Sequence, residues 1–155
     1  MYVGEGQRPP ALLDVLQWIE AEQLRVNIEL KHDVPSRRAL IVALARVLRA
    51  SGCSPERVIL SSFHPGMVAA TALTLRHLPS AWLVHSEQRF VKTAPCWREL
   101  GAAAVHPERT LTTRSRVAQW QRRGALVNVW TVNDPGEATD LAALGVDGLI
   151  SDLPG

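Results

Sequence analysis

Six short apolar segments recur along the chain and alternate with segments of helical periodicity. Successive apolar segments start roughly 20–30 residues apart, as repeated strand–helix units require. Segments such as "ALVNVW" at 125–130 are nearly continuously apolar, which is typical of parallel strands covered by helices. The pattern therefore predicts an α/β fold built on a parallel sheet.

The expected strands are 25–30, 57–63, 81–86, 101–107, 125–133 and 146–151. The expected helices are 11–22, 37–50, 65–77, 90–100, 112–124 and 134–145. Ser36 and Asp134 are predicted N-caps, and Gly124 and Gly145 are predicted to follow the last helical turns.

A TIM-barrel type (β/α) fold explains this alternation better than a dinucleotide-binding domain, because no GxGxxG follows any strand. Barrel chemistry gathers at the carboxyl ends of the strands. The carboxyl ends of the expected strands carry polar residues: Glu29, Lys31, Ser61, Ser62, His64, His85, His106, Thr131, Asn133, Ser151 and Asp152.

Composition narrows the function classes. The 155 residues, 46% of them hydrophobic, suit one domain, here taken as 1–155. The net charge of +2 is too small, and the arginines too dispersed along the sequence, to predict a nucleic-acid partner. No apolar run is long enough for a membrane span, and the N-terminus has no signal pattern. Cys53 and Cys96, without CxxC spacing, suit a reducing compartment, so we expect a cytoplasmic protein.

Glu29 and Lys31 form the most informative pair. Both lie on one face at the end of an apolar strand. A divalent cation beside a phosphate would satisfy both, with the carboxylate on the metal and the ammonium on a phosphoryl oxygen. The alternative is an ordinary salt bridge at a solvated strand end.

The remaining candidates are single residues. His64, His85 and His106 each follow an expected strand, so they either converge at a barrel mouth or are ordinary loop histidines. Trp130 either packs in the core or forms a flat wall for a ligand. Cys53 and Cys96 have no metal-ligand pattern and are expected to pack as small side chains.

The segments "VNIELK", "VILSSF" and "GALVNVWTVNDPGEATDLAALGVDGLISDLPG" resemble consecutive signatures of the glycerophosphodiester phosphodiesterases. The resemblance runs from about residue 8 to the C-terminus and implies a TIM barrel. It implies metal-dependent hydrolysis of a glycerophosphodiester to glycerol 3-phosphate and an alcohol, in glycerol and lipid metabolism. It also implies that Glu29 is a metal ligand, that Lys31 binds phosphate, and that Phe63 and Trp130 line the substrate pocket.

Other family signatures have no counterpart in the sequence. The family places His-Arg-Gly, Glu-Asn-Thr, a Glu-x-Asp metal pair and a His-Asp dipeptide before the strand that matches 25–30. Here His32-Asp33 comes after that strand. His64 replaces the usual aspartate after the phenylalanine, and Leu153 replaces a larger residue, which leaves the alcohol group of the substrate open.

The chain therefore resembles strands three to eight of the family barrel, N-terminally truncated. We expect an incomplete, six-stranded barrel segment whose strands at 26–30 and 148–151 lack outer partners, which favours self-association or a complementing N-terminal segment. Because the N-terminal signatures are missing, we expect weak or absent binding of Mg²⁺ or Ca²⁺ and weak or no hydrolysis. The alternatives are a non-catalytic remnant or phosphodiester-binding module and, if the resemblance is coincidental, another phosphate-binding barrel.

Overall fold

The computed structural model describes residues 8–88 and 96–153, and in them six parallel strands form one sheet in sequential order. The strands are β1 (Val26–Glu29), β2 (Val58–Ser62), β3 (Ser80–Val84), β4 (Ala104–Pro107), β5 (Leu126–Val129) and β6 (Gly148–Leu149). The helices are α1 (Leu12–Ala21), α2 (Arg37–Ser51), α3 (Pro65–Thr74), α4 (Arg114–Arg122) and α5 (Pro135–Ala143), with short 3-10 turns at Pro55–Arg57 and Arg109–Leu111.

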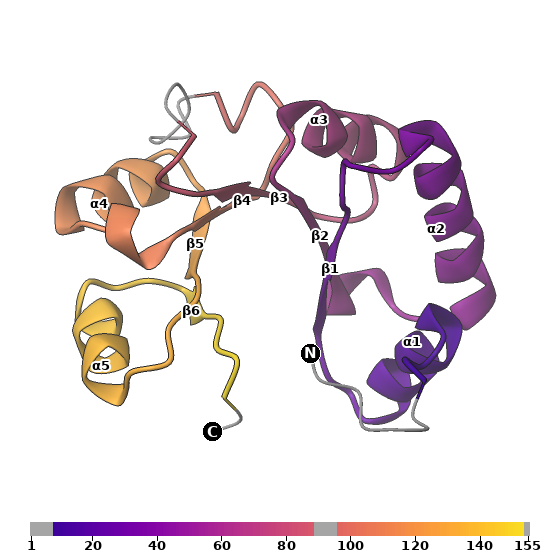
Figure 1. Ribbon diagram of the computed structural model, residues 1–155, viewed down its shortest axis with the longest axis horizontal. Helices are drawn as coiled ribbons and strands as arrows, with labels where there is room; N and C mark the ends of the chain where they lie inside the picture. The colour runs from indigo at the N-terminus through magenta and orange to yellow at the C-terminus, as the bar shows by residue number, and fades with distance from the viewer. Residues whose placement is uncertain (1–7, 89–95, 154–155) are drawn as a thin grey trace.

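The sheet arches from β1 to β6 and carries the helices on its convex side, so the strands form half of a barrel (Figure 1). Within the described residues, β1 and β6 each pair with one strand and leave their outer edges unpaired. Both features confirm the predicted fold.

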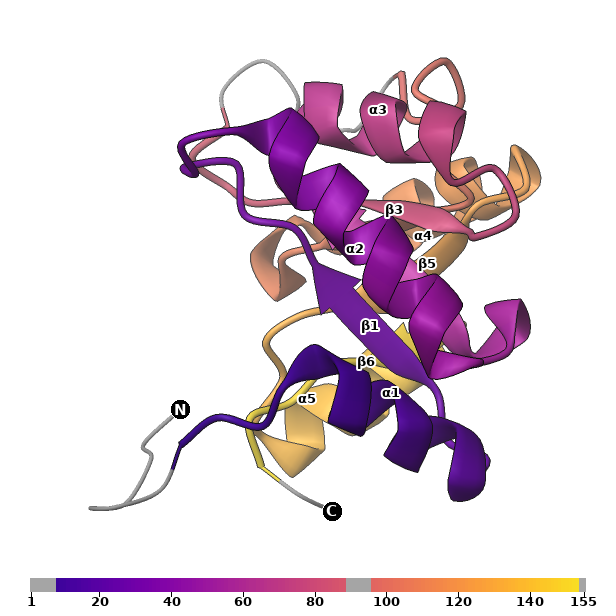
Figure 2. The ribbon, with the colours of Figure 1, turned by 90° about the vertical axis from the view of Figure 1, so that its right-hand side faces the viewer.

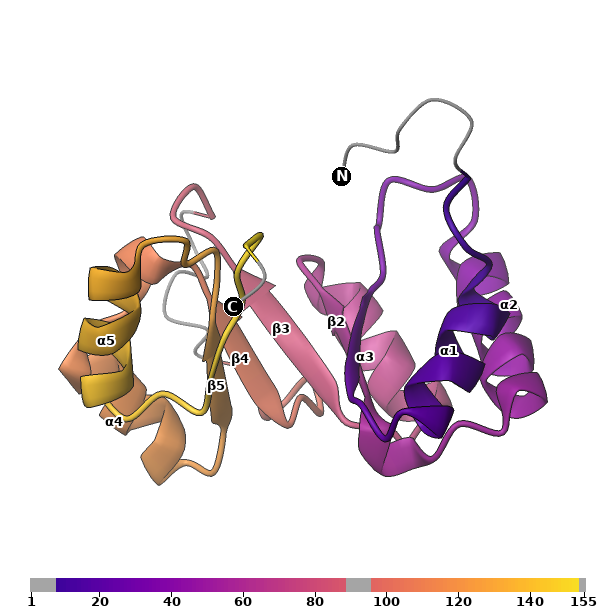
Figure 3. The same cartoon turned by 90° about the horizontal axis from the view of Figure 1, so that it is seen from below.

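Two apolar cores join the helices to the sheet, because alternate strand residues point to its convex face. One packs Leu16 of α1, Leu44 of α2 and Met67 of α3 against Leu60 of β2. The other packs Trp120 of α4 and Leu141 of α5 against strands β3–β5. Figure 3 shows α4 and α5 outside one end of the arched sheet and α1 and α2 outside the other, and Figure 2 shows α2 in front of β1.

The predicted helix ends are confirmed. The Ser36 and Asp134 side chains accept hydrogen bonds from the N–H groups of Ala39 and Glu137 at 3.2 and 2.7 Å. Gly124 and Gly145 take the left-handed backbone conformation after α4 and α5, with φ of 88° and 82°.

Two element predictions need correction. Residues 96–100, the described part of the helix expected at 90–100, form turns, and the remainder lies outside the described residues. His106 lies inside β4 rather than after it. The short run "GAAAVHP" gave no sign that its strand begins as late as Ala104.

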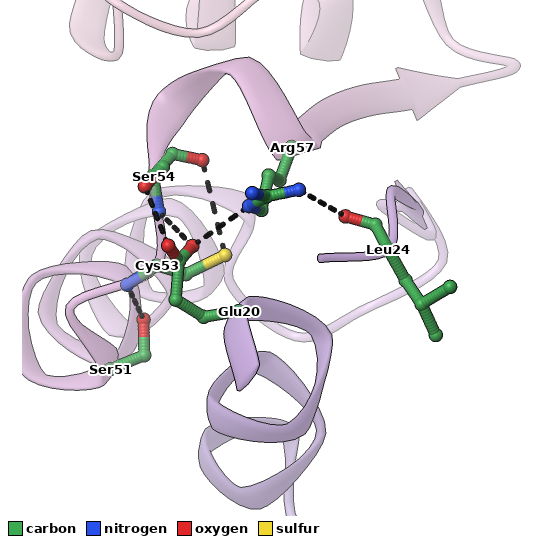
Figure 4. Close-up of polar contacts among 6 residues, drawn as sticks. All are labelled: Glu20, Leu24, Ser51, Cys53, Ser54 and Arg57. Atoms are coloured by element: carbon green, nitrogen blue, oxygen red, sulfur yellow. Dashed lines mark hydrogen bonds and ion pairs between the residues drawn. The ribbon is translucent and has the colours of Figure 1, made fainter. Parts of the chain in front are cut away.

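A polar network at the amino-terminal end of the strands ties α1 to the start of β2 (Figure 4). The carboxylate of Glu20 accepts hydrogen bonds from the Ser54 N–H and hydroxyl, at 2.8 and 2.9 Å, and lies 3.2 Å from Nε of Arg57. These contacts, the Ser54 backbone N–H first, lower the pKa of the Glu20 carboxyl below its ordinary value of 4.5.

We expect Glu20→Gln to lower the melting temperature at neutral pH. A carboxyl whose pKa is lowered by folding stabilises the fold above its unfolded pKa, and this contribution is lost as the pH falls through the lower folded value. The difference from the wild type should therefore shrink below about pH 4.5. Glu22→Gln, an exposed change one residue beyond α1, is the matched control for thermal melts. An equal loss in both variants would contradict the assigned role of Glu20.

Candidate functional site

A hollow of about 580 Å³ lies at the carboxyl ends of β1 to β5. Its walls come from five successive strand ends, as parallel strands place their carboxyl ends at one edge of the sheet. The lining residues are Glu29, Lys31, His32, Asp33, Phe63, His85, Ser86, Glu87, Glu108 and Trp130. This hollow is called the mouth. All four residues chosen from the sequence, Glu29, Lys31, Phe63 and Trp130, are therefore brought together in the mouth.

Glu29 and Lys31 form the ion pair that the sequence left open as an alternative. Lys31 Nζ lies 2.7 Å from Glu29 Oε1, and the side chains are 67% and 32% exposed. Glu29 ends β1 on the concave face, opposite the buried Leu30. An ion pair that is reached by solvent in this way adds little stability.

Phe63 and Trp130 are held in fixed orientations. The rings meet edge to face, with centroids 5.4 Å apart. The indole N–H of Trp130 donates to the carbonyl of His106 at 2.8 Å, and Gln88 Nε2 donates to the carbonyl of Phe63. Trp130 is thus a half-buried wall residue anchored by its one donor, as aromatic residues at binding sites often are.

The three candidate histidines lie in different places relative to the mouth. His85 lines the mouth, 5.6 Å from Phe63 between ring centroids. Its Nδ1 accepts the Glu87 N–H at 3.3 Å, which assigns the proton of the neutral ring to Nε2.

His64 lies beside the mouth, at the start of α3, and Nη1 of Arg37 is 3.2 Å from its Nε2. Partial burial, followed by the Arg37 and His32 charges, lowers the pKa of His64.

His106 does not reach the mouth. It is fully buried on the concave side of β4, its Nε2 is 3.0 Å from Nδ2 of Asn128, and its Nδ1 has no partner among the described residues. Burial lowers the pKa of His106 to about 4. The expectation that His106 follows a strand is therefore wrong, because the residue lies within β4 and is buried.

Glu108 is a mouth residue that the sequence analysis missed. It follows β4 directly, and its carboxylate accepts the Ser86 N–H at 2.6 Å. That hydrogen bond is the main cause of its lowered pKa, so the group is anionic at neutral pH. Glu108 directly follows the expected strand at 101–107, so the rule that chemistry gathers at strand ends could have identified it, but His106 was chosen at that strand instead.

The polar residues at the ends of β5 and β6 bind one another. Asn133 Oδ1 accepts from the Ser151 hydroxyl and the Asp152 N–H at 3.0 Å each, and Asn133 Nδ2 donates to Asp152. None of the three lines the mouth. They link the segment after β5 to the segment after β6 and do not extend the site.

The donor set of the mouth does not fit a firmly held divalent cation. Hard cations take about six oxygen ligands, several from the protein. Among the described residues, no group of three or more His, Cys, Asp or Glu side chains is arranged to hold a metal ion. Cys53 and Cys96 are free thiols away from the mouth.

Comparison with known proteins gives a consistent match. Residues 4–155 match the model of the glycerophosphoryl diester phosphodiesterase family. The chain is 28% identical to the uncharacterized protein YqiK of Bacillus subtilis strain 168, and 26% identical to a glycerophosphodiester phosphodiesterase of Bacillus altitudinis. Each alignment covers 94% of this chain and 59% of the relative. The chain thus spans about six tenths of the length of the curated relatives it matches.

The fold has solved counterparts. An Oleispira antarctica phosphodiesterase, solved in complex with the product sn-glycerol-3-phosphate, superposes with a TM-score of 0.80 at 22% identity. That match covers 94% of this chain and 58% of the other. At this identity the likeness concerns the fold alone.

Proposed function

The chain belongs to the glycerophosphoryl diester phosphodiesterase family, and we propose that its mouth binds a glycerophosphodiester through the phosphate. The observation that carries the proposal is the convergence of Glu29, Lys31, Phe63 and Trp130 on one hollow. The Lys31 ammonium would face a phosphoryl oxygen, and the edge-to-face rings of Phe63 and Trp130 would pack against the carbon atoms of the glycerol or alcohol group.

Hydrolysis of the diester is the reaction that the family implies, and we propose that this chain alone performs it weakly or not at all. Glu29 is the residue that would contact Mg²⁺ or Ca²⁺, but a single carboxylate paired with Lys31 would hold the ion weakly. His85 has its Nε2–H available as a hydrogen-bond donor to a bound phosphate, whereas buried His106 has no access to it. A phosphodiester-binding module without turnover is the second candidate, and the same donor set favours it.

We also propose that the unpaired edges of β1 and β6 are where a second copy or a complementing segment adds. A segment carrying His-Arg-Gly and Glu-x-Asp would supply the signatures that these 155 residues lack. The free cysteines support the proposed cytoplasmic location, since thiols remain reduced there. None of the described helices has the length and apolarity needed to cross a bilayer.

Lys31→Gln is expected to weaken binding of sn-glycerol 3-phosphate by about tenfold, because the exposed Lys31 side chain should contribute near the lower end of the roughly 1.5–3 kcal/mol of a charge-assisted hydrogen bond. Phosphorus NMR line broadening or equilibrium dialysis measures the affinity without requiring turnover. The matched control is Arg25→Gln, which removes the same charge before the other end of β1. Binding that is unchanged in Lys31→Gln, or weakened equally in both variants, would refute the proposed phosphate site.

A further inference from the structure

The outer surface of α2 carries arginines without acidic neighbours on the helix. α2 contains four arginines and no aspartate or glutamate. The whole chain has a net charge of +2, so all other residues together carry −2. α2 therefore carries a larger positive charge than the whole chain, and more than α4, which holds three arginines without an acidic residue.

Three of these arginines form a stripe. Arg38, Val42, Arg46 and Arg49 follow one another at spacings of four, four and three, which places them along one side of the helix. All four are exposed, and the buried residues Ile41, Leu44 and Leu48 lie on the other side. No ion pair or hydrogen bond joins these arginine side chains to the rest of the described chain.

The fourth arginine has a different role. Arg37 lies about a quarter turn away, where its Nε donates to the carbonyl of His32 at 3.0 Å and its Nη1 meets His64. It fixes the start of α2 beside the mouth. Arg37 therefore does not belong to the stripe.

Apolar surface runs beside the stripe. A groove of about 470 Å³ between α2 and α3 is walled by Ile41, Val42, Met67 and Ala70, with Arg37 and Arg38 at one end and no acidic residue in its lining. Leu73, 64% exposed, lies on the Gly66–Ala70 side of α3, and Val42 is 43% exposed. α3 itself carries no charged residue. Figure 2 shows α2 facing outward, with no other element in front of it.

We propose that this α2–α3 face, formed by Arg38, Val42, Arg46, Arg49, Leu73 and the groove, binds the surface of a bilayer that contains anionic phospholipid. Basic residues near such a surface are attracted by its negative potential. Val42, Leu73 and the groove walls gain contact with the acyl boundary. A nucleic acid would contact the arginines but would leave these apolar side chains exposed to water. A lipid surface is therefore complementary to more of the residues on this face.

Sedimentation with unilamellar vesicles of phosphatidylcholine, with and without phosphatidylserine, tests the proposal. The full chain should pellet with the phosphatidylserine vesicles at low salt and stay in solution with phosphatidylcholine alone. At about 1 M salt the Debye length falls to ~3 Å, and the chain should be released from the phosphatidylserine vesicles. The triple variant Arg38→Gln, Arg46→Gln, Arg49→Gln should lose about fivefold in partitioning for each arginine, or on the order of a hundredfold.

The matched control is Arg98→Gln, Arg114→Gln, Arg122→Gln, which removes the same charge from exposed positions before and on α4, away from α2 (Figure 1). Circular dichroism and melting temperature verify that both triple variants fold. Equal partitioning of wild type and the α2 triple variant would overturn the proposal, as would an equal loss in the control. Retention by duplex DNA without retention by vesicles would also overturn it and assign the face to nucleic acid.

Discussion

The purified chain, given a glycerophosphodiester and Mg²⁺ or Ca²⁺, should release glycerol 3-phosphate at least ~10⁴-fold more slowly than a family enzyme that carries two acid–base histidines. Positioned general acid–base groups contribute roughly 10²–10⁴-fold each, and the 155 residues contain no His-Arg-Gly to supply one. Of the candidate histidines, only His85 lines the mouth. The single strand-end carboxylate matched to a metal ligand, Glu29, is engaged by Lys31 at 2.7 Å.

A metal-supplemented turnover assay on wild type, Glu29→Gln and Glu56→Gln tests this prediction. Glu56 precedes β2, at the opposite end of the strands from the mouth, so its variant controls for loss of a carboxylate alone. Robust wild-type turnover that Glu29→Gln abolishes and Glu56→Gln preserves would show that the chain contains a complete site. The binding-module alternative would then be wrong.

Addition of a second polypeptide distinguishes the two remaining candidates. If a separate segment bearing His-Arg-Gly and Glu-x-Asp restores turnover, the chain is one part of a split phosphodiesterase. If the chain binds sn-glycerol 3-phosphate through Lys31 yet gains nothing from the segment, a phosphodiester-binding module is the better description. Loss of turnover with intact binding also separates failure of the chemistry from failure of the proposed phosphate site.

Local signals in the sequence predicted most of the fold. Ser36, Asp134, Gly124 and Gly145 mark helix ends by backbone chemistry that acts within a few residues. Strand order also followed, since successive strand–helix units place parallel strands side by side. The turns at 96–100 escaped prediction because a short mixed segment carries no decisive period.

The residues of the candidate site could be predicted from the sequence where they stand at or next to the end of a strand. Glu29, Phe63 and Trp130 converge because each closes or directly follows an observed strand: β1 ends at Glu29, β2 at Ser62 and β5 at Val129. At β4 the expected strand ends at Pro107, as observed, but His106 within it was chosen instead of Glu108 directly after it. Residues two apart in a strand share a face, and each residue advances the strand by about 3.3 Å. His106 therefore lies in the interior, two residues before the position at which Glu108 lines the mouth.

That interior position gives His106 a large predicted effect on stability. Its pKa is lowered by burial to about 4 in the folded protein, whereas a histidine in the unfolded chain titrates near 6.5. Below the unfolded value the unfolded chain binds a proton that the folded chain resists, so stability falls as the pH drops from 6.5 toward 4. The free energy of unfolding should decrease by about 2 kcal/mol between about pH 7 and pH 5, and by about 3 kcal/mol once both states are protonated.

Urea unfolding between about pH 7 and pH 5 measures this effect above the range in which Glu20 and Glu108 take up protons. His106→Gln should remove most of the slope, and His64→Gln only a smaller part, since the His64 ring is partly exposed. Asn128→Asp provides a second variant, because a carboxylate 3.0 Å from Nε2 would favour the imidazolium and shrink the acid sensitivity. A pH slope unaltered in both His106→Gln and Asn128→Asp would show that the buried histidine does not control the acid stability of the half-barrel.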